Sequence, residues 1–195
     1  MEPITLTTGR LLLRPFVPGD ADALYAACQD PDIQRWTVVP SPYGRADAEL
    51  FARQLSPGGW QDDSMYNFAV VVRDGGALAG ALGINRRTGP GTYEVGFWTA
   101  REHRGLGYTT EAVLCAARWT FTSLRGDRLE WRAETGNLAS RAVALRAGFR
   151  MEGDQRSAVI NKGVRRDAWA GALLPPDLGL PGTDAYLPSG APGRP

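Results

Sequence analysis

The sequence is poor in the residues from which metal sites and disulfide frameworks are built. Among 195 residues there is one histidine, His103, and there are two cysteines, Cys28 and Cys115. A single histidine excludes a multi-histidine metal centre, and no cysteine or acidic cluster has the spacing of metal ligands. The cysteines lie far apart in segments that look helical, so we expect packed thiols, no disulfide framework, no metal, and a reducing cytoplasm as the location.

Long hydrophobic runs and an excess of one charge are also missing. No apolar stretch approaches the length of a membrane span, and the N-terminus lacks the basic leader and apolar core of a signal peptide. The 22 basic and 21 acidic residues leave a net charge of +1, which argues against a general nucleic-acid binder. A hydrophobic content of 43% is typical of a globular domain. We therefore expect no membrane and no nucleic-acid partner.

The pattern of apolar residues predicts a mixture of strands and helices. Strands are expected at 10–16, 67–72, 77–85, 93–99 and 129–133, with two more joined near 161–163. Helices are expected at 18–29, with Asp20 as a cap, and at 45–55, 110–124 and 137–147. The segment 36–43 is expected to be irregular, and the run Ser56-Pro57-Gly58-Gly59 is expected to end the second helix.

The order of these elements predicts an α+β fold in a single domain over residues 1–174. Three strands precede the helix at 110–124, which indicates a mostly antiparallel sheet with one β-α-β crossover between the fourth and fifth strands. From residue 175 to residue 195 the chain is rich in proline and glycine, and we expect this tail to be flexible.

The stretch RGLGYTTE, from Arg104 to Glu111, joins the fourth strand to the third long helix. A strand that turns through glycines into a helix leaves N–H donors unpaired at the positive end of the helix dipole, which suits a phosphate. Gly105 and Gly107 allow the backbone to turn tightly. The stretch is not a nucleotide P-loop, and Thr110 stands where a dinucleotide fingerprint has its third glycine. A phosphate-bearing cofactor is predicted, with an ordinary turn as the alternative.

The pattern Arg104-x-x-Gly107-x-Thr109 resembles the acetyl-CoA motif of the GNAT superfamily, Arg/Gln-x-x-Gly-x-Gly/Ala, from which Thr109 departs. Residues 137–140 and 145–149 resemble the Asn-x-x-Ser…Lys-x-Gly-Phe segment of one branch, with Arg146 in place of the lysine. That branch acetylates the N-terminal residues, such as alanine, of ribosomal proteins. Residues 93–98, 8–15 and 163–169 fit the same branch, so the resemblance covers nearly everything from residue 8 to residue 174.

The resemblance implies a GNAT-type sheet of about seven strands flanked by about four helices. The fourth and fifth strands splay apart, and the pantetheine arm of acetyl-CoA pairs with the free edge of the fourth strand, as an unpaired edge allows. The implied cofactor-binding residues are Phe97, Trp98, Thr99, Arg104, Gly105, Leu106, Gly107, Tyr108, Thr109, Thr110 and Asn137. Arg101 is expected to be solvated.

The resemblance also implies direct attack of a primary amine on the thioester. Glu94 is the candidate general base, a strand-four N–H near Trp98 is the candidate oxyanion donor, and Ser140 is the candidate partner of the leaving thiolate. The alternatives are that Glu94 pairs with an arginine across the sheet and that Asn137 and Ser140 merely begin a helix.

The acceptor is expected to be the N-terminal α-amine of a protein or peptide. In this family the acceptor cleft is lined by segments that here contain the aromatic residues Trp36, Tyr43, Trp60 and Trp169. These side chains are expected to form a pocket beside the amine, and the alternative is that they only cover the sheet. Two other functions remain open: the same chemistry on a small amine, such as a polyamine, an amino acid or an aminoglycoside, and a CoA-binding module without catalysis. Monomer and homodimer are both open.

Overall fold

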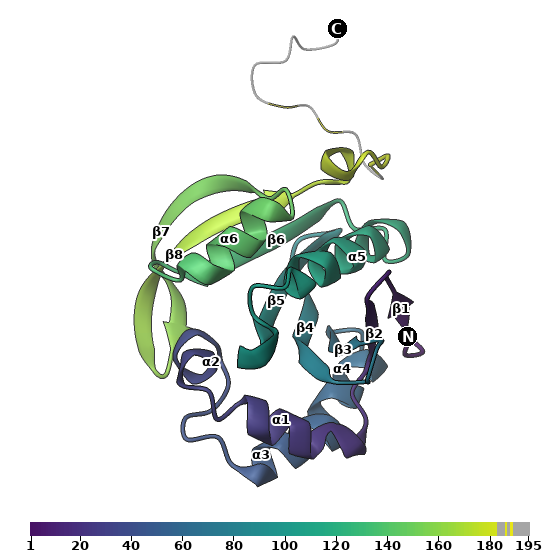
Figure 1. Cartoon of the computed structure of the whole chain (residues 1–195). Coiled ribbons are helices and arrows are strands. Elements are labelled where there is room, and N and C mark those ends of the chain that lie inside the picture. The colour runs from purple at the N-terminus through teal and green to yellow at the C-terminus, as the bar shows by residue number, and fades with distance from the viewer. Residues whose placement is uncertain (183–185, 187, 189–195) are drawn as a thin grey trace, which may run out of the picture.

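The computed structural model describes residues 1–182, 186 and 188, and its strands form one eight-stranded sheet (Figure 1). The strands are β1 (Leu6–Thr7), β2 (Leu11–Pro15), β3 (Met65–Val72), β4 (Leu78–Arg86), β5 (Thr92–Thr99), β6 (Arg128–Glu134), β7 (Arg150–Asn161) and β8 (Val164–Leu173). Their order is β1-β2-β3-β4-β5-β6-β8-β7, and every neighbouring pair is antiparallel except β5 and β6. The predicted α+β fold with one crossover is confirmed. The eighth strand is the short β1, which the sequence pattern missed.

The helices cover both faces of this sheet. They are α1 (Ala21–Ala27), α2 (Pro31–Trp36), α3 (Arg45–Leu50), a π-helix (Phe51–Leu55), α4 (Ser56–Gln61), α5 (Tyr108–Thr122) and α6 (Leu138–Arg146), with 3-10 turns at Pro18–Asp20, Arg101–His103 and Pro175–Leu178. α1 and α3 pack on one face, whereas α5 packs on the other. Among the described residues, no helix has both the length and the apolar character needed to cross a membrane.

The short helix α2 is an element that the sequence analysis missed. Asp30 precedes it, and its carboxylate accepts hydrogen bonds from the amides of Asp32 at 2.9 Å and Ile33 at 3.1 Å. Pro31 occupies the first helical position, where a missing N–H costs nothing. The Asp-Pro pair was therefore a readable start signal. The expected cap Asp20 instead accepts from the amide of Val17 at 2.8 Å and makes no cap bond to α1.

The predicted end of the second helix at residues 56–59 is wrong. The helical path continues through the π-helix into α4, with Pro57 in its first turn. Gly59 is present because of packing: a Cβ there would lie 2.6 Å from the carbonyl oxygen of Met65 on β3. The glycine thus lets the helix approach the sheet closely, rather than breaking the helix.

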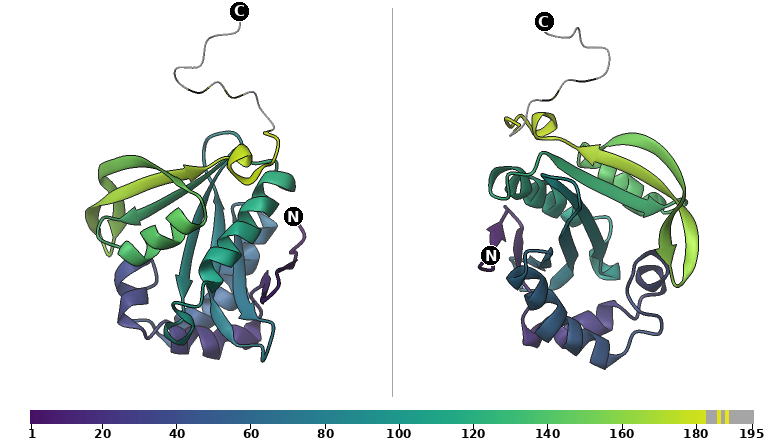
Figure 2. Two further views of the ribbon diagram at one scale, coloured as in Figure 1. Left: turned by 45° about the horizontal axis from the view of Figure 1, so that its top comes forward. Right: turned by 180° about the vertical axis from the view of Figure 1, so that it is seen from behind.

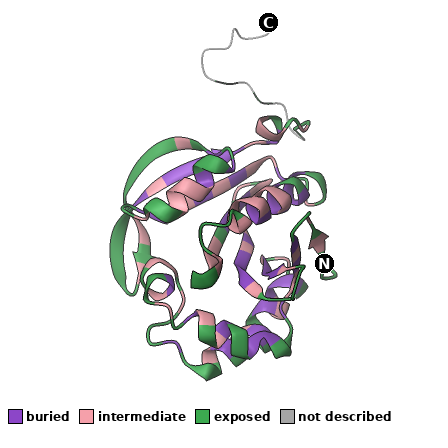
Figure 3. Cartoon of the chain, viewed as in Figure 1, coloured by how far each residue is buried: buried purple, intermediate pink, exposed green. Residues whose placement is uncertain are grey.

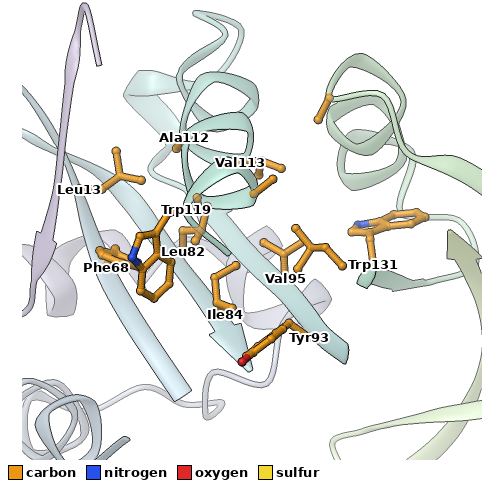
Figure 4. Close-up of a cluster of buried hydrophobic side chains, with 14 of the residues drawn as sticks. Leu13, Phe68, Leu82, Ile84, Tyr93, Val95, Ala112, Val113, Trp119 and Trp131 are labelled. Carbon is orange, nitrogen blue, oxygen red and sulfur yellow. The ribbon is translucent and has the colours of Figure 1, made fainter. Parts of the chain in front are cut away.

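Two hydrophobic clusters hold the layers together (Figure 3), and Figure 4 draws the one on the α5 face. On the α5 face, Trp119 packs edge-on against Phe68, with ring centroids 5.6 Å apart, and Val113 faces the same strands. On the other face, Leu24 of α1 is buried with Ala69 of β3. Each large side chain buried in this way stabilises the fold by roughly 1.5–3 kcal/mol.

The packed part of the chain extends beyond the expected boundary at residue 174. Pro175 is buried, and Leu178 and Leu180 pack against the α5 cluster. Asp177 accepts a hydrogen bond from the amide of Leu174 at 2.9 Å and pairs with Arg150 at 2.7 Å. The start of the tail was thus wrongly predicted as unpacked, because its prolines form a 3-10 turn. Residues 183–185, 187 and 189–195 of the expected tail lie outside the described residues.

Candidate functional site

The parallel strands β5 and β6 separate soon after they meet. Their register pairs Thr92 with Arg128, Tyr93 with Leu129 and Glu94 with Glu130, and ends there. Among the described residues, β5 beyond Glu94 pairs with β4 alone, and β6 beyond Glu130 pairs with β8 alone. The facing backbone edges of residues 95–99 and 131–134 are therefore free to pair with something else, and the expected splay is confirmed (Figure 1).

The glycine turn that leads from β5 to α5 is exposed. Gly105 and Gly107 have φ of 77° and 78°, in the left-handed region that glycine tolerates. In the part of the chain that the structure describes, the N–H groups of residues 105–110 donate to no protein acceptor. These donors stand at the start of a 15-residue helix, where the dipole also favours an anion. The turn fits a diphosphate.

The departure from the family motif at Thr109 is accommodated by the end of β5. The hydroxyl of Thr109 is hydrogen-bonded to the hydroxyl of Thr99. The β-branched side chain is thus directed toward the strand, where it does not compete with a ligand for the backbone donors. The carbonyl oxygen of Thr99 also accepts a hydrogen bond from Nε of Arg104 at 3.3 Å.

The guanidinium of Arg104 already has carboxylate partners in this structure, and its expected contact with a phosphate stays a prediction. It pairs with Asp30 at 2.7 Å and with Asp32 at 3.0 Å, both at the start of α2. Burial raises the pKa of Asp30, but hydrogen bonds from Arg104 and from the α2 amides outweigh burial and leave that pKa below its ordinary value. Arg104 therefore ties the turn to α2. Arg101 is exposed, and His103 is half-buried near Tyr108.

The side chains of strand β5 serve the two cores, which leaves its backbone for a ligand. Phe97 packs against the α5 cluster, and Trp98 packs against the α1 and α3 cluster.

The two cysteines are packed thiols. Cys115 is half-buried, and its pKa is raised by burial. Burial also raises the pKa of Cys28, to about 12. Both thiols are packed and protonated at neutral pH, so neither has the thiolate that a nucleophile needs.

Asn137 and Ser140 stand where β6 leads into α6, and both are half-buried. Asn137 is the N-cap, and its side-chain oxygen accepts from the amide of Ser140 at 3.1 Å. The hydroxyl oxygen of Ser140 accepts from the indole of Trp131 at 3.0 Å. No acceptor among the described residues takes the Ser140 hydroxyl hydrogen or the Asn137 amide hydrogens. The capping role is therefore present, and both donors remain for a ligand.

Glu94 lies on the face of the sheet opposite to α5 and α6, and its pairing with Glu130 is the last one before β5 and β6 separate. Its Oε2 accepts from Nε and Nη2 of Arg132 at 3.1 and 2.5 Å, and Arg87 lies 3.5 Å away. The predicted alternative, a pair with an arginine across the sheet, is therefore present. Its Oε1 has no donor in the described part of the chain, so the carboxylate keeps one oxygen for a proton.

The aromatic residues expected at the acceptor cleft do not gather in one place. Tyr43 and Trp60 are 7% and 1% exposed and belong to the two cores, and the Trp60 indole donates to a backbone oxygen on β3. For these two, covering the sheet is the correct interpretation. Trp169 is half-buried beside Arg141 of α6, at 5.4 Å. Trp36 is half-buried at the end of α2, under the guanidinium of Arg35 at 4.1 Å.

Glu134, at the end of β6, is a buried carboxylate that the sequence analysis did not single out. Arg35 of α2 donates to it at 2.9 and 2.5 Å, and Asn161 donates at 3.1 Å. The hydrogen bonds from Arg35, with the one from Asn161, lower the pKa of Glu134 to about 2, although burial opposes the shift. Glu134 thus joins α2 to the β7–β8 hairpin, which lie side by side in Figure 1. The alternation Glu130-x-Arg132-x-Glu134 was a readable sign of a charged face.

Arg10, in the N-terminal segment, was quoted only as part of a resemblance, yet it reaches the glycine turn. Its Nη1 donates to the carbonyl oxygen of Leu106 at 3.0 Å, and its guanidinium lies 4.8 Å from the Tyr108 ring centroid. It also pairs with Glu111 in the first turn of α5, at 2.6 Å. No pattern local to residue 10 signals this contact, because its partners Leu106 and Glu111 are about a hundred residues away in the chain.

Comparisons with known proteins agree with this geometry. The model of the acetyltransferase (GNAT) domain family matches residues 10–150. The chain is 28% identical to the uncharacterized N-acetyltransferase p20 of Bacillus licheniformis over 171 residues, which are 87% of this chain and 96% of that one.

Two solved structures have the same fold. A putative ribosomal-protein-serine acetyltransferase from Vibrio cholerae superposes with a TM-score of 0.80 at 25% identity, over 88% of this chain and 98% of that one. The structure of Mycobacterium smegmatis RimJ in complex with CoA-disulfide superposes with a TM-score of 0.79 at 22% identity, over 92% of each chain. The family match, the diverging strands and the open glycine turn lead to one conclusion: the chain belongs to the GNAT family and is an acetyl-CoA-dependent N-acetyltransferase.

Proposed function

We propose that this acetyltransferase acts on the N-terminal α-amine of a protein or peptide. Acetyl-CoA supplies the acetyl group as an activated thioester. The observation that carries the proposal is the separation of β5 and β6 beyond Glu94, with Glu94 on one face of the gap and Ser140 on the other. This arrangement suits an amine that enters from one face and a thiol that leaves toward the other.

Glu94 takes the role of general base. An ammonium group has to lose a proton before it attacks, which at pH 7 costs roughly 1 kcal/mol for an α-amine and about 4–5 kcal/mol for a lysine. The free Oε1 accepts this proton directly or through a water, while Arg132 holds Oε2 in place. One carboxylate held by arginine is modest assistance, which suits the α-amine better than the lysine.

The three remaining roles fall to the β5 backbone and to the start of α6. An N–H near Trp98 on the free edge of β5 donates to the oxyanion that forms on attack. The Ser140 hydroxyl, whose oxygen already accepts a hydrogen bond from Trp131, donates a hydrogen bond to the departing thiolate sulfur. Asn137 keeps its side-chain NH₂ for a pantetheine carbonyl while its oxygen caps α6.

The charges on the Glu94 face favour a peptide over a polycation. Each carboxylate there has an arginine partner: Glu94 pairs with Arg132, Glu130 with Arg128, and Glu134 with Arg35. A polyamine or an aminoglycoside binds best to carboxylates without such partners. The similarity to a putative ribosomal-protein-serine acetyltransferase adds support for a protein acceptor.

A thiol-release assay with matched peptides tests the proposal. One peptide has a free N-terminal serine or alanine and one internal lysine, and its twin carries an N-formyl group. We expect kcat/KM to be about a hundredfold higher for the free peptide, and spermidine and an aminoglycoside to be poor acceptors. Equal rates for the twins contradict the α-amine assignment. Tight CoA binding without turnover of any amine supports a CoA-binding module instead.

A further inference from the structure

The N-terminal segment around Thr8 and Arg10 converges on the start of α5, more than a hundred residues later in the chain. The hydroxyl of Thr8 donates to Oε1 of Glu111 at 2.5 Å. Nε of Arg10 donates to Oε2 of the same carboxylate at 2.7 Å. Figure 2 shows the two N-terminal strands beside α5. Glu111 therefore anchors Arg10 against the helix.

From this anchor, Arg10 reaches the glycine turn itself. Nη1 donates to the carbonyl oxygen of Leu106 at 3.0 Å, and the guanidinium lies over the Tyr108 ring. Nη2 lies 3.6 Å from the point where a Cβ on Gly107 would be. The donors of Arg10 are thus directed at the protein, so its effect on a ligand acts through the turn.

Because a peptide unit is planar, the hydrogen bond to the Leu106 carbonyl also determines where the next N–H, that of Gly107, points. The carbonyl of Leu106 and the N–H of Gly107 belong to one trans peptide unit and point in opposite directions. When Arg10 holds the Leu106 oxygen, the Gly107 N–H has to point away from Arg10. Rotation of this peptide unit changes ψ of Leu106 and φ of Gly107, and glycine tolerates other values of φ, so without Arg10 the unit is free to rotate.

We propose that Arg10 is a positioning residue for the diphosphate of acetyl-CoA, because it fixes the direction of the Gly107 N–H. Thr8 and Glu111 hold the guanidinium in place for this purpose. The inference concerns the cofactor and is independent of the acceptor assigned above. It gives a function to the Thr8-Gly9-Arg10 segment, which the catalytic roles leave unused.

The test is calorimetric binding of CoA to the full chain, supplemented by kinetics with acetyl-pantetheine, which lacks the diphosphate. We expect Arg10→Ala to weaken CoA binding about tenfold or more, the effect of one lost charge-assisted hydrogen bond on a pre-organised donor. With acetyl-pantetheine we expect kcat/KM to equal that of the parent protein. Arg10→Lys should be intermediate, because one ammonium cannot span both Leu106 and Glu111.

Arg73→Ala is the matched control. Arg73 donates to the carbonyl oxygens of Thr8 and Gly9 at 3.0 and 3.3 Å and so braces the same segment without touching the turn. It should leave CoA affinity unchanged. The proposal is overturned if Arg10→Ala binds CoA as tightly as the parent, or if it loses CoA and acetyl-pantetheine activity equally. Should Arg10→Ala fail to fold, the same comparison with Arg10→Lys decides.

Discussion

The indole of Trp131 donates a 3.0 Å hydrogen bond to the hydroxyl oxygen of Ser140. Trp131 is buried on β6, and Ser140 is in the first turn of α6. The bond fixes which lone pair of the serine is used and so limits the directions in which its hydrogen can point. A residue that looks ordinary in the sequence thereby becomes an oriented donor beside the gap between β5 and β6.

Ser140→Ala is expected to lower kcat about tenfold or more without changing the Kd for CoA, because the donor serves the departing sulfur and not the diphosphate. The same change leaves the Trp131 indole without an acceptor and should cost about 1–3 kcal/mol of unfolding free energy. Single-turnover kinetics and urea titration measure the two effects. An unchanged kcat for a folded Ser140→Ala protein removes Ser140 from the mechanism.

Glu94→Gln preserves the shape of the side chain and removes its basicity. We expect kcat/KM for a peptide to fall about a hundredfold, the lower range for a lost general base, with CoA affinity retained. Glu130→Gln is the control, since Glu130 is paired opposite Glu94 in the strand register and engages Arg128 instead. Similar losses for the two variants would mean that the charged face, rather than a base at residue 94, matters.

The sequence predicted most strands and long helices, and the single crossover, because the signals for these elements are local. Alternating apolar residues marked the strands, and Gly148, with φ of 92°, ends α6 as expected. Local signals do not say which distant element a side chain will pack against. The sequence therefore did not predict that Tyr43 and Trp60 are core residues or that Arg104 pairs with Asp30. These contacts depend on elements that are distant in sequence.

The buried Glu134 makes stability depend on pH in the acid range. Its pKa is lowered from 4.5 to about 2, chiefly by hydrogen bonds from Arg35. A depressed folded-state pKa stabilises the protein fully above the unfolded value, and this stability is lost as the pH falls from about 4.5 toward about 2. We expect Glu134→Gln to be less stable than the parent at pH 6 and to lose less stability between pH 5 and pH 3. Parallel curves for the two proteins contradict this assignment.

Gly107→Ala tests the conformation of the cofactor turn. Gly107 has φ of 78°, and an alanine there should strain the backbone by about 1–2 kcal/mol and reorient the neighbouring amides. CoA should bind more weakly. Gly75, with φ of 82° in the β3–β4 turn, provides the control, because Gly75→Ala imposes similar strain outside the turn at residues 105–110. If both variants bind CoA equally well, the exposed amides of the turn are not the diphosphate site.

The most direct measurement is an amide ¹H–¹⁵N titration of the full chain with CoA, with ADP and with pantetheine in parallel. The account predicts that CoA shifts the amides of residues 105–110 together with those of residues 96–99, that ADP shifts only the first group, and that pantetheine shifts only the second. Unmoved amides at 105–110 in the presence of saturating CoA would contradict it.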